Sequence, residues 1–433
     1  MKSFLFLIGI LSIFFLNILE LPGLSNQQIA LIDKAIKDKK ENKELICNPA
    51  FVEICPSIYK KNIEYIKKLI GNDVKICIVM KGDAYGHGIR ELIDAAIETN
   101  PDYIAAIDNS EFKAISDKLK KKKANIPLLR LVPPLFVEVL ESQINDYGVE
   151  EIVGSLGEAQ MLSELADELS KETGKNIIIP IHINVETGMG RMGMRNIEDM
   201  KKVMKINNLK LKGIMTHFAK VYEMEKGLEM TKEQTNKFDE VVKELDLEGK
   251  VIRHIANSGA TAMYPWTRKD MVRVGSLTYG EDVEGQNPEG ILKPVFKSFK
   301  SYVAIIENKI PENSPVGYDS EEYTSPNKIS TTATVRVGYN NAYPYENAYA
   351  TESDVLIKGK RFPIIGKTSM NMVVIDITAQ DEKNRIQVGD EVVLIGKQGK
   401  EKITLEEVAN KNKIGITEML LEIGNLNSKV IAE

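Results

Sequence analysis

Apolar segments alternate with amphipathic segments from about residue 56 to residue 274, and this rhythm then stops. Helical patterns occupy intervening stretches such as Gly157–Ser170, Asn196–Lys205 and Lys232–Leu245. Eight strands that alternate with helices over roughly 210 residues are typical of a (β/α)8 TIM-type barrel. A doubly wound open sheet is the alternative, because strand order cannot be read from the sequence. The eight predicted strands are Ile76–Met80, Tyr103–Ile107, Pro127–Val132, Glu151–Ser155, Ile177–Asn184, Leu211–Thr216, Val251–Ala256 and Met271–Val274.

After about residue 290 the helical rhythm gives way to short β-rich segments separated by turn residues. We therefore predict a barrel over residues 47–288 and a β-rich C-terminal domain over 289–433 that ends in one or two short helices. Residues 47–55 could pair with the second domain. The predicted strands of this domain include Ser301–Lys309, Ser330–Tyr339, Ala350–Lys358, Val373–Ile377 and Glu391–Ile395.

The first 25 residues have the pattern of a secretory signal peptide. Met1-Lys2-Ser3 precedes an apolar run from Phe4 to Leu16, and Pro22-Gly23 would break the helix near a cleavage site. The run is shorter than the ~20 residues that a membrane-spanning helix needs, although an uncleaved anchor is an alternative because no clean Ala-x-Ala site follows. We expect a periplasmic protein with no membrane attachment after signal removal, in which residues 26–46 form a linker or arm.

The net charge limits the possible binding partners, and the positions of the cysteines limit the possible disulfides. The formal charge of −5 gives no electrostatic reason to expect nucleic acid. An extended segment from Cys47 to Cys55 would hold its ends ~26 Å apart, which excludes a disulfide between them. A bridge from Cys77 to one of the other two cysteines stays open.

A lysine and a glycine-rich turn stand directly after the first predicted barrel strand, in the segment Lys81-Gly-Asp-Ala-Tyr85-Gly-His-Gly. A rigid strand end and apolar surroundings favour the neutral, nucleophilic amine of a Schiff-base lysine, which makes pyridoxal phosphate the first cofactor to consider. The glycines would let backbone N–H groups approach an anion. The alternative is a lysine at a strand end beside an ordinary turn.

Small residues follow the last two predicted barrel strands, in Asn257-Ser258-Gly259 and in Gly275-Ser276. Exposed N–H groups at these positions are typical of the phosphate cup of a barrel enzyme. Either segment alone could be an ordinary loop. Beside Lys81, the two together predict a phosphate site.

The segment Gly188-Met-Gly190-Arg191-Met-Gly193 matches the dinucleotide fingerprint G-x-G-x-x-G. That fingerprint should open a helix immediately after a strand, whereas here the helical pattern begins only near Asn196. We therefore favour a loop that holds Arg191 toward a carboxylate or phenolate oxygen. A surface arginine is the alternative.

The histidines and tyrosines add weaker signals. None of the histidines shows metal-ligand spacing, and the cysteines are scattered, so no metal site is expected. His182 and His254 fall inside strand patterns and suit interior positions, whereas His217 stands at a strand end and suits a functional or a structural role. Tyr318 and Tyr339 each follow a glycine in the β-rich region, where a tyrosine near cations can act as a general base.

Taken together, these motifs resemble those of the alanine racemase family, the fold-type III pyridoxal-phosphate enzymes. The resemblance covers nearly all of the chain after residue 47. The motifs that match in order are Lys81-Gly-Asp-Ala-Tyr-Gly-His-Gly, Thr187-Gly-Met-Gly-Arg-Met-Gly, Met215-Thr-His-Phe-Ala, Ala256-Asn-Ser-Gly-Ala, Val272-Arg-Val-Gly-Ser-Leu-Thr-Tyr-Gly and Val316-Gly-Tyr.

This resemblance implies an amino-acid racemase that acts on free amino acids. Lys81 would bind the cofactor and act as one acid/base, and Tyr318 would act on the opposite face from the partner subunit of a homodimer, whose active site lies at the subunit interface. Arg191 would contact the cofactor ring oxygen and the substrate carboxylate, which the Met370 N–H would also face. Arg273 would hydrogen-bond the pyridine nitrogen, and His217 would support both Arg273 and Tyr318. The phosphate would be held by Tyr85, Ser258, Gly275 and Ser276.

Three departures from alanine-specific members point to a broad-specificity racemase. Thr417 stands where those enzymes carry a tyrosine that narrows the site, Met370-Asn371 replaces Met-Asp, and this chain has a signal pattern. Cys77, four residues before the lysine, also resembles the exported broad-specificity enzymes. The arginine loop, however, keeps the Gly190-Arg-Met-Gly193 of alanine racemases.

Other functions remain as alternatives. An alanine-specific racemase that supplies D-alanine for the cell wall fits the same motifs. A fold-type III decarboxylase would need a catalytic cysteine in the β-rich domain, and no cysteine follows Cys77. A non-catalytic pyridoxal-phosphate-binding protein would not need Tyr318, and an exported solute-binding protein would show no cofactor absorbance.

Overall fold

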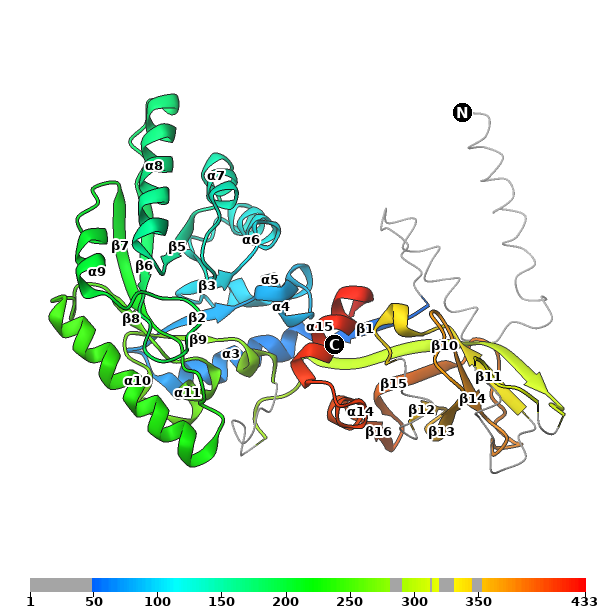
Figure 1. The fold of residues 1–433 in the computed structure, drawn as a ribbon. Coiled ribbons are helices and arrows are strands. Elements are labelled where there is room, and N and C mark those ends of the chain that lie inside the picture. The colour runs from blue at the N-terminus through cyan, green and yellow to red at the C-terminus, as the bar shows by residue number, and fades with distance from the viewer. Residues whose placement is uncertain (1–48, 281–289, 312–313, 319–330, 345–352) are drawn as a thin grey trace, which may run out of the picture. The chain divides into compact units, whose positions relative to one another are not determined.

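The computed structural model describes residues 49–280, 290–311, 314–318, 331–344 and 353–433 (Figure 1). These residues divide into two compact units. The barrel unit comprises Val52–Ser298 and Ile414–Glu433, and the β-rich unit comprises Phe299–Lys413 with the described residues before Val52. The signal pattern at 1–25, the predicted arm at 26–46 and Cys47 lie outside the described residues.

A ring of eight parallel strands forms the barrel unit, in the order β8-β7-β6-β5-β4-β3-β2-β9. Two backbone hydrogen bonds close it between β8 and β9, from Asp270 N to Arg253 O (3.1 Å) and from Arg273 N to Ala256 O (2.9 Å). The barrel prediction is therefore confirmed and the open sheet is excluded. The strands are β2 (Lys75–Val79), β3 (Tyr103–Ala106), β4 (Leu128–Arg130), β5 (Val149–Val153), β6 (Ile179–Asn184), β7 (Leu209–Met215), β8 (Ile252–His254) and β9 (Met271–Val274).

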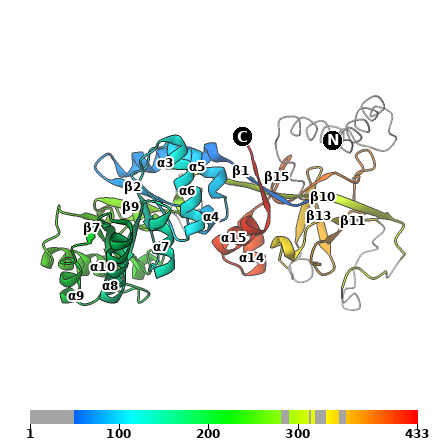
Figure 2. The ribbon, with the colours of Figure 1, turned by 90° about the horizontal axis from the view of Figure 1, so that it is seen from above.

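Helices lie outside this ring (Figures 1 and 2). The first, α3 (Pro56–Ile70), begins at a proline, whose fixed φ suits the first helical turn, and ends at Gly71. It buries Ile63, Ile66 and Ile70, which recur at helical spacing. The others are α5 (Ile89–Glu98), α6 (Asn109–Lys122), α7 (Phe136–Ile144), α8 (Leu156–Thr173), α9 (Ile197–Val203), α10 (Met224–Glu244), α11 (Ser258–Met263), α12 (Ser276–Tyr279) and the short 3-10 helix Pro265–Thr267.

The β-rich unit is an antiparallel sheet in which β10 also pairs with β15, so that six strands form a closed ring. The predicted strands are present. The sequence pattern does not predict two further strands, β16 (Glu401–Ile403) and β13 (Lys360–Ile365), and for β13 the reason is local. β13 follows a two-residue hairpin turn, Lys358-Gly359, in which both residues have positive φ, and the strand contains Pro363. The elements are β10 (Phe296–Asn308), β11 (Thr331–Val335), β12 (Asp354–Ile357), β13 (Lys360–Ile365), β14 (Val373–Asp376), β15 (Glu391–Gln398), β16 (Glu401–Ile403), α14 (Leu405–Asn412) and the 3-10 helix Tyr339–Asn341.

The last residues of the chain return to the barrel unit as α15 (Ile416–Leu426) and β17 (Ser428–Ile431). In the sheet order, β1 (Phe51–Ile54) lies between β10 and β17. Cys55 and Cys77 are both buried free thiols, so no disulfide joins these two. Across the described ranges, no helix combines the length and the apolar character required to cross a membrane.

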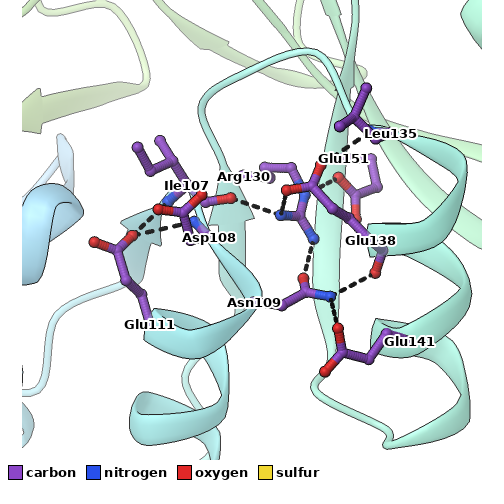
Figure 3. Close-up of polar contacts among 9 residues, drawn as sticks. All are labelled: Ile107, Asp108, Asn109, Glu111, Arg130, Leu135, Glu138, Glu141 and Glu151. Atoms are coloured by element: carbon purple, nitrogen blue, oxygen red, sulfur yellow. Dashed lines mark hydrogen bonds and ion pairs between the residues drawn. The ribbon is translucent and has the colours of Figure 1, made fainter.

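A buried ion pair between β4 and β5 is linked by hydrogen bonds to the neighbouring helices (Figure 3). Arg130, which is fully buried, donates from Nε to Glu151 Oε2 (2.8 Å) and from Nη2 to Asn109 Oδ1 (2.8 Å). Asn109 in turn donates to Glu138 O (2.9 Å) and Glu141 Oε2 (2.8 Å) on α7. Burial raises the pKa of Glu151 to about 7 in spite of the Arg130 charge.

We expect Arg130→Met to lower the free energy of unfolding by about 3–5 kcal/mol above pH 7, where Glu151 is mostly ionised in the wild type, because the variant must bury this carboxylate without its counter-charge or protonate it. The loss should be smaller at low pH, where Glu151 is protonated. Urea denaturation with the double variant Arg130→Met/Glu151→Leu is the matched control, since removing both charges should restore much of the stability. A single variant within about 1 kcal/mol of wild type would contradict this role.

Candidate active site

The predicted barrel residues gather at the C-terminal end of the strands. Lys81 follows β2 by two residues, His217 follows β7 by two residues, and Arg273 lies within β9. Ser258 begins α11 after β8, and Ser276 begins α12 after β9. Because the strands are parallel, their C-terminal ends meet on one face of the barrel, where loops of barrel enzymes carry function.

The residues after Lys81 form a left-handed turn. Gly82, Asp83 and Ala84 have φ of 63°, 49° and 57°, and Tyr85 has φ of 55°. Left-handed backbone costs roughly 1–2 kcal/mol per non-glycine residue, so three in succession need support from their surroundings. The element labelled α4 (Lys81–Tyr85) is therefore a strained turn and not a regular helix.

Three partners hold this turn through Asp83. Its N–H donates to Glu111 Oε1 (2.9 Å), its Oδ1 accepts from Ile89 N (2.8 Å), and its Oδ2 pairs with Lys429 Nζ (3.0 Å). Figure 3 shows how the other Glu111 oxygen accepts from Ile107 N (2.9 Å) at the start of α6. The Lys81 turn is thus fixed both to α6 and to the C-terminal strand β17.

Helix α15 packs directly on the same turn. A Cβ added to Gly82 would lie 2.8 Å from Leu421 Cδ2, and one added to Gly86 would overlap the Leu420 carbonyl. A Cβ on Gly424 would in turn overlap the Gly86 carbonyl. Only glycine permits this close approach of the helix to the turn.

The charges around Lys81 favour its neutral form. Burial, followed by the charge of Arg191, lowers the pKa of Lys81; Glu111 opposes the shift and Arg273 adds to it. Burial and the charges of Arg273, Arg191 and Lys81 also lower the pKa of His217 to about 3, so this imidazole is neutral at physiological pH. The two arginines can therefore attract an anion, and the Lys81 amine beside them can act as a nucleophile.

The loop at residues 188–193, which carries Arg191, does not form a nucleotide-binding site. The Glu186 carboxylate accepts hydrogen bonds from Gly188 N (2.6 Å) and Gly190 N (2.9 Å), so these donors are taken, and α9 begins only at Ile197. The dinucleotide fingerprint is thus excluded here. The loop instead places Arg191 on a cavity that is also lined by Asn184, Val185, Glu186, Met189, Met192, Thr216 and His217.

Arg273 is buried and held at both terminal nitrogens. Nη1 donates to the His254 carbonyl and to His254 Nδ1 (3.1 Å), and Nη2 donates to Thr216 O (2.8 Å) and His217 Nδ1 (3.3 Å). Within the part of the chain that the structure describes, no acceptor is bonded to the remaining donor, Nε–H. That donor is available to a ligand atom that can accept a hydrogen bond.

The predicted phosphate residues form a compact set around Gly275. Ser258 Oγ accepts from Gly275 N (3.0 Å) and from Leu277 N (3.4 Å), which keeps the hydroxyl hydrogen as a donor. A Cβ on Gly275 would overlap the Tyr85 hydroxyl, so glycine is required for Tyr85 to approach. The Gly275 N–H is already used within the protein, which sequence reasoning did not anticipate.

Tyr318 and Met370 lie in the β-rich unit, and their side chains are 63% and 52% exposed. Both residues lie near the segment that runs from Gly366 to Met370. Val316, two residues before Tyr318, packs on Gly366. Met370 itself accepts a hydrogen bond at its carbonyl from Asn340 N (2.9 Å). Gly317, with φ of 71°, makes the bend that presents Tyr318. Among the described residues, no group of three or more His, Cys, Asp or Glu side chains could hold a metal ion.

Comparison with known families agrees with this arrangement. Residues 54–283 match the model "Alanine racemase, N-terminal domain", and residues 297–431 match "Alanine racemase, C-terminal domain". The chain therefore belongs to the alanine racemase family. Its relatives are racemases, so it is an isomerase that acts on amino acids.

Two curated relatives differ in their substrates. A lysine racemase from Proteus mirabilis is 34% identical over 90% of this chain and 91% of its own length. A broad-specificity amino-acid racemase from Pseudomonas taetrolens is 33% identical over 89% of this chain and 90% of its own length.

Two solved structures share the fold. Alanine racemase from Clostridium difficile 630 has a TM-score of 0.77 at 29% identity, covering 90% of this chain and 97% of that one. Alanine racemase from Bartonella henselae, which carries covalently bound pyridoxal phosphate, has a TM-score of 0.73 at 22% identity, covering 89% of this chain and 100% of that one.

Proposed function

We propose that this protein is a broad-specificity amino-acid racemase that depends on pyridoxal phosphate and uses Lys81 and Tyr318 as its two acid/base residues. The observation that carries the proposal is the group at the barrel mouth: a half-buried lysine with a lowered pKa beside Arg191, Arg273 and His217. Pyridoxal phosphate, when bound, supplies an aromatic ring that withdraws electrons from the substrate α-carbon.

The donors of the site suit this cofactor. Arg273 Nε–H is a donor for the ring nitrogen, and the two Nη groups that bind His254 and Thr216 hold it in place. The hydroxyl of Ser258 and the backbone and hydroxyl of Ser276 are proposed to bind the phosphate together with Tyr85 and Gly275. For Gly275 to donate to phosphate, its bond to Ser258 would have to be shared or exchanged.

In this proposal Lys81 holds the cofactor and moves a proton to or from one face of the substrate α-carbon. Tyr318 moves a proton on the other face, and a homodimer supplies it from the partner subunit. Arg191 and the Met370 N–H bind the substrate carboxylate. Two groups on opposite faces are needed because inversion requires removal of the proton from one side and its return from the other.

A threonine at position 417, in place of a bulky residue, would leave the substrate pocket open and so supports broad specificity. Thr417 lies one turn before Leu421 on α15, so the two side chains share a helix face, and Leu421 packs on Gly82 in the Lys81 turn. The lysine and broad-specificity racemases among the relatives agree with an open pocket. A racemisation panel with alanine, serine, lysine and arginine tests the proposal directly; activity with alanine alone would favour the alanine-specific alternative.

We expect Thr417→Tyr to reduce kcat/KM for lysine by about 10–200-fold while changing that for alanine little, because excess bulk excludes the longer side chain. The control Thr417→Val changes the polarity of this position without adding a ring, so it should leave the lysine-to-alanine ratio near that of wild type. A tyrosine variant with an unchanged ratio would remove Thr417 from the specificity of the site.

We also propose that the protein acts in the periplasm. The charged and apolar pattern of residues 1–25 supports export. Cell fractionation with an antibody against the barrel tests this, and recovery of full-length protein from the cytosol would contradict it.

A further inference from the structure

A chain of hydrogen bonds runs through the barrel interior from Arg273 to a carboxylate. Arg273 Nη1 meets His254 Nδ1 at 3.1 Å, and His254 Nε2 meets His182 Nδ1 at 2.8 Å. His182 Nε2 meets Glu150 Oε2 at 2.7 Å, and that oxygen also accepts from the Tyr103 hydroxyl at 3.2 Å. All of these residues are buried.

The two ends of this chain fix the positions of its protons. A guanidinium can only donate, so His254 Nδ1 must accept and the proton of His254 must sit on Nε2. His182 Nδ1 then accepts that proton, and its own proton on Nε2 points to Glu150, which as a carboxylate can only accept. Both histidines are therefore neutral Nε2–H tautomers, and no other arrangement satisfies every bond.

The backbone makes room for this chain at one position. A Cβ on Gly213 of β7 would overlap His182 Nδ1, so glycine is required opposite the histidine. The pairing of β6 with β7 also shifts register there, since Ile181 pairs with Leu211 and His182 pairs with Gly213. Such bulges re-aim side chains near functional sites.

Burial and the nearby cations favour the neutral forms of both histidines, and Glu150 opposes this for His182. Burial lowers the pKa of His254 well below its usual value, as do His182 and Arg273. Burial lowers the pKa of His182 as well, with Lys212 and Arg273 adding to the shift and Glu150 opposing it. Cys77, also in the barrel interior, has its pKa raised to about 12 and so adds no negative charge.

We propose that Glu150 is a positioning residue that fixes, through His182 and His254, the proton arrangement that orients Arg273. This role rests on the proposed function, in which Arg273 binds the cofactor ring nitrogen. Without an acceptor at position 150, the His182 proton can move to Nδ1 and push that of His254 to its own Nδ1. An N–H of His254 would then face an N–H of Arg273, and the guanidinium would lose this anchor.

The first test uses the full chain without added cofactor, so it does not depend on racemisation. The ¹⁵N spectrum of histidine-labelled wild type should show His182 and His254 as Nε2–H tautomers that do not change across neutral pH. His87 is an internal reference of the opposite kind, because its Nδ1 lies 3.0 Å from Ala84 O and 3.1 Å from Tyr85 O and must donate. Single histidine substitutions assign the signals. An Nδ1–H or a protonated ring at His182 or His254 would overturn the proposal.

The second test measures pyridoxal phosphate affinity and the position of its absorbance band in Glu150→Leu and Glu150→Gln. The leucine variant should bind about 10–100-fold more weakly, by analogy with the loss of a carboxylate that supports a metal-binding histidine, and its band should shift. The glutamine variant should lose less because its side-chain oxygen still accepts. Glu151→Gln is the matched control: it changes the next residue of β5, which pairs with Arg130 and not with the histidines.

The outcomes separate the two claims. Wild type that takes up no pyridoxal phosphate would overturn the proposed function, and with it the role of Glu150 toward that cofactor. Wild type that binds, together with a Glu150→Leu variant of unchanged affinity and band, would overturn only the role of Glu150. An equal loss in Glu151→Gln would do the same, because it would mark a general effect of packing in β5.

Discussion

Replacing Lys81 by alanine should reduce racemisation by at least about 10³-fold, because it removes both the group that holds the cofactor and one of the two acid/base groups. Burial and the charges of Arg191 and Arg273 keep this amine neutral more readily than a surface lysine. Purified wild type should show the absorbance of bound pyridoxal phosphate, and the variant should not. Both signals can be measured on the same preparation by absorbance and by a chiral assay.

Lys75→Ala is the matched control for this variant. Lys75 begins the same strand, β2, at the opposite end of the barrel, and its exposed amine lies 3.5 Å from Asp102. An exposed pair of this kind contributes little stability, so the control should keep the cofactor and its activity. A wild type that stays colourless after reconstitution, or a Lys81→Ala variant that still racemises, would refute the assignment.

The barrel and its mouth could be predicted because short-range patterns determine them. Each predicted barrel strand is a mostly apolar segment of four to eight residues, and each lies within a few residues of its observed position. Polar residues directly after such runs must meet at one face of a parallel barrel. The sequence pattern therefore predicts that Lys81, His217, Ser258 and Arg273 lie at the same end of the barrel.

Contacts between distant segments could not be predicted. Asp83 pairs with Lys429, which lies 346 positions further along the chain, and nothing in either local sequence marks the partner. The same holds for Glu111, which caps α6 and also supports the Lys81 turn. The sequence also does not predict that α15 belongs to the barrel unit, because α15 follows the β-rich segments along the chain.

For the two interior histidines, the sequence pattern predicts burial but not hydrogen-bond partners. His182 and His254 fall within strands, so burial could be expected, and the structure confirms it. Their connection to Glu150 and Arg273 depends on strand order and on the register shift opposite Gly213. Neither can be read from periodicity, because a shift of one residue turns a side chain to the other face.

Replacing Tyr318 by phenylalanine should leave the cofactor bound and lower racemisation by about 10²–10⁴-fold, the usual contribution of a positioned acid/base group. The loss in kcat/KM should be equal in both directions, since two enantiomers have an equilibrium constant of one. The asymmetry should appear in isotope exchange. In D₂O, one enantiomer should still exchange its α-proton through Lys81 without inversion, while the other should exchange much more slowly.

Tyr339→Phe is the control that makes this result specific, because Tyr339 also follows a glycine in the β-rich unit and is 40% exposed. The same loss of a hydroxyl there should leave racemisation and both exchange rates near wild type. Equal exchange from both enantiomers in Tyr318→Phe would mean that one group serves both faces, which a single amine fixed in the turn after β2 cannot do. Unchanged racemisation in that variant would remove Tyr318 from catalysis and require another acid/base residue opposite Lys81.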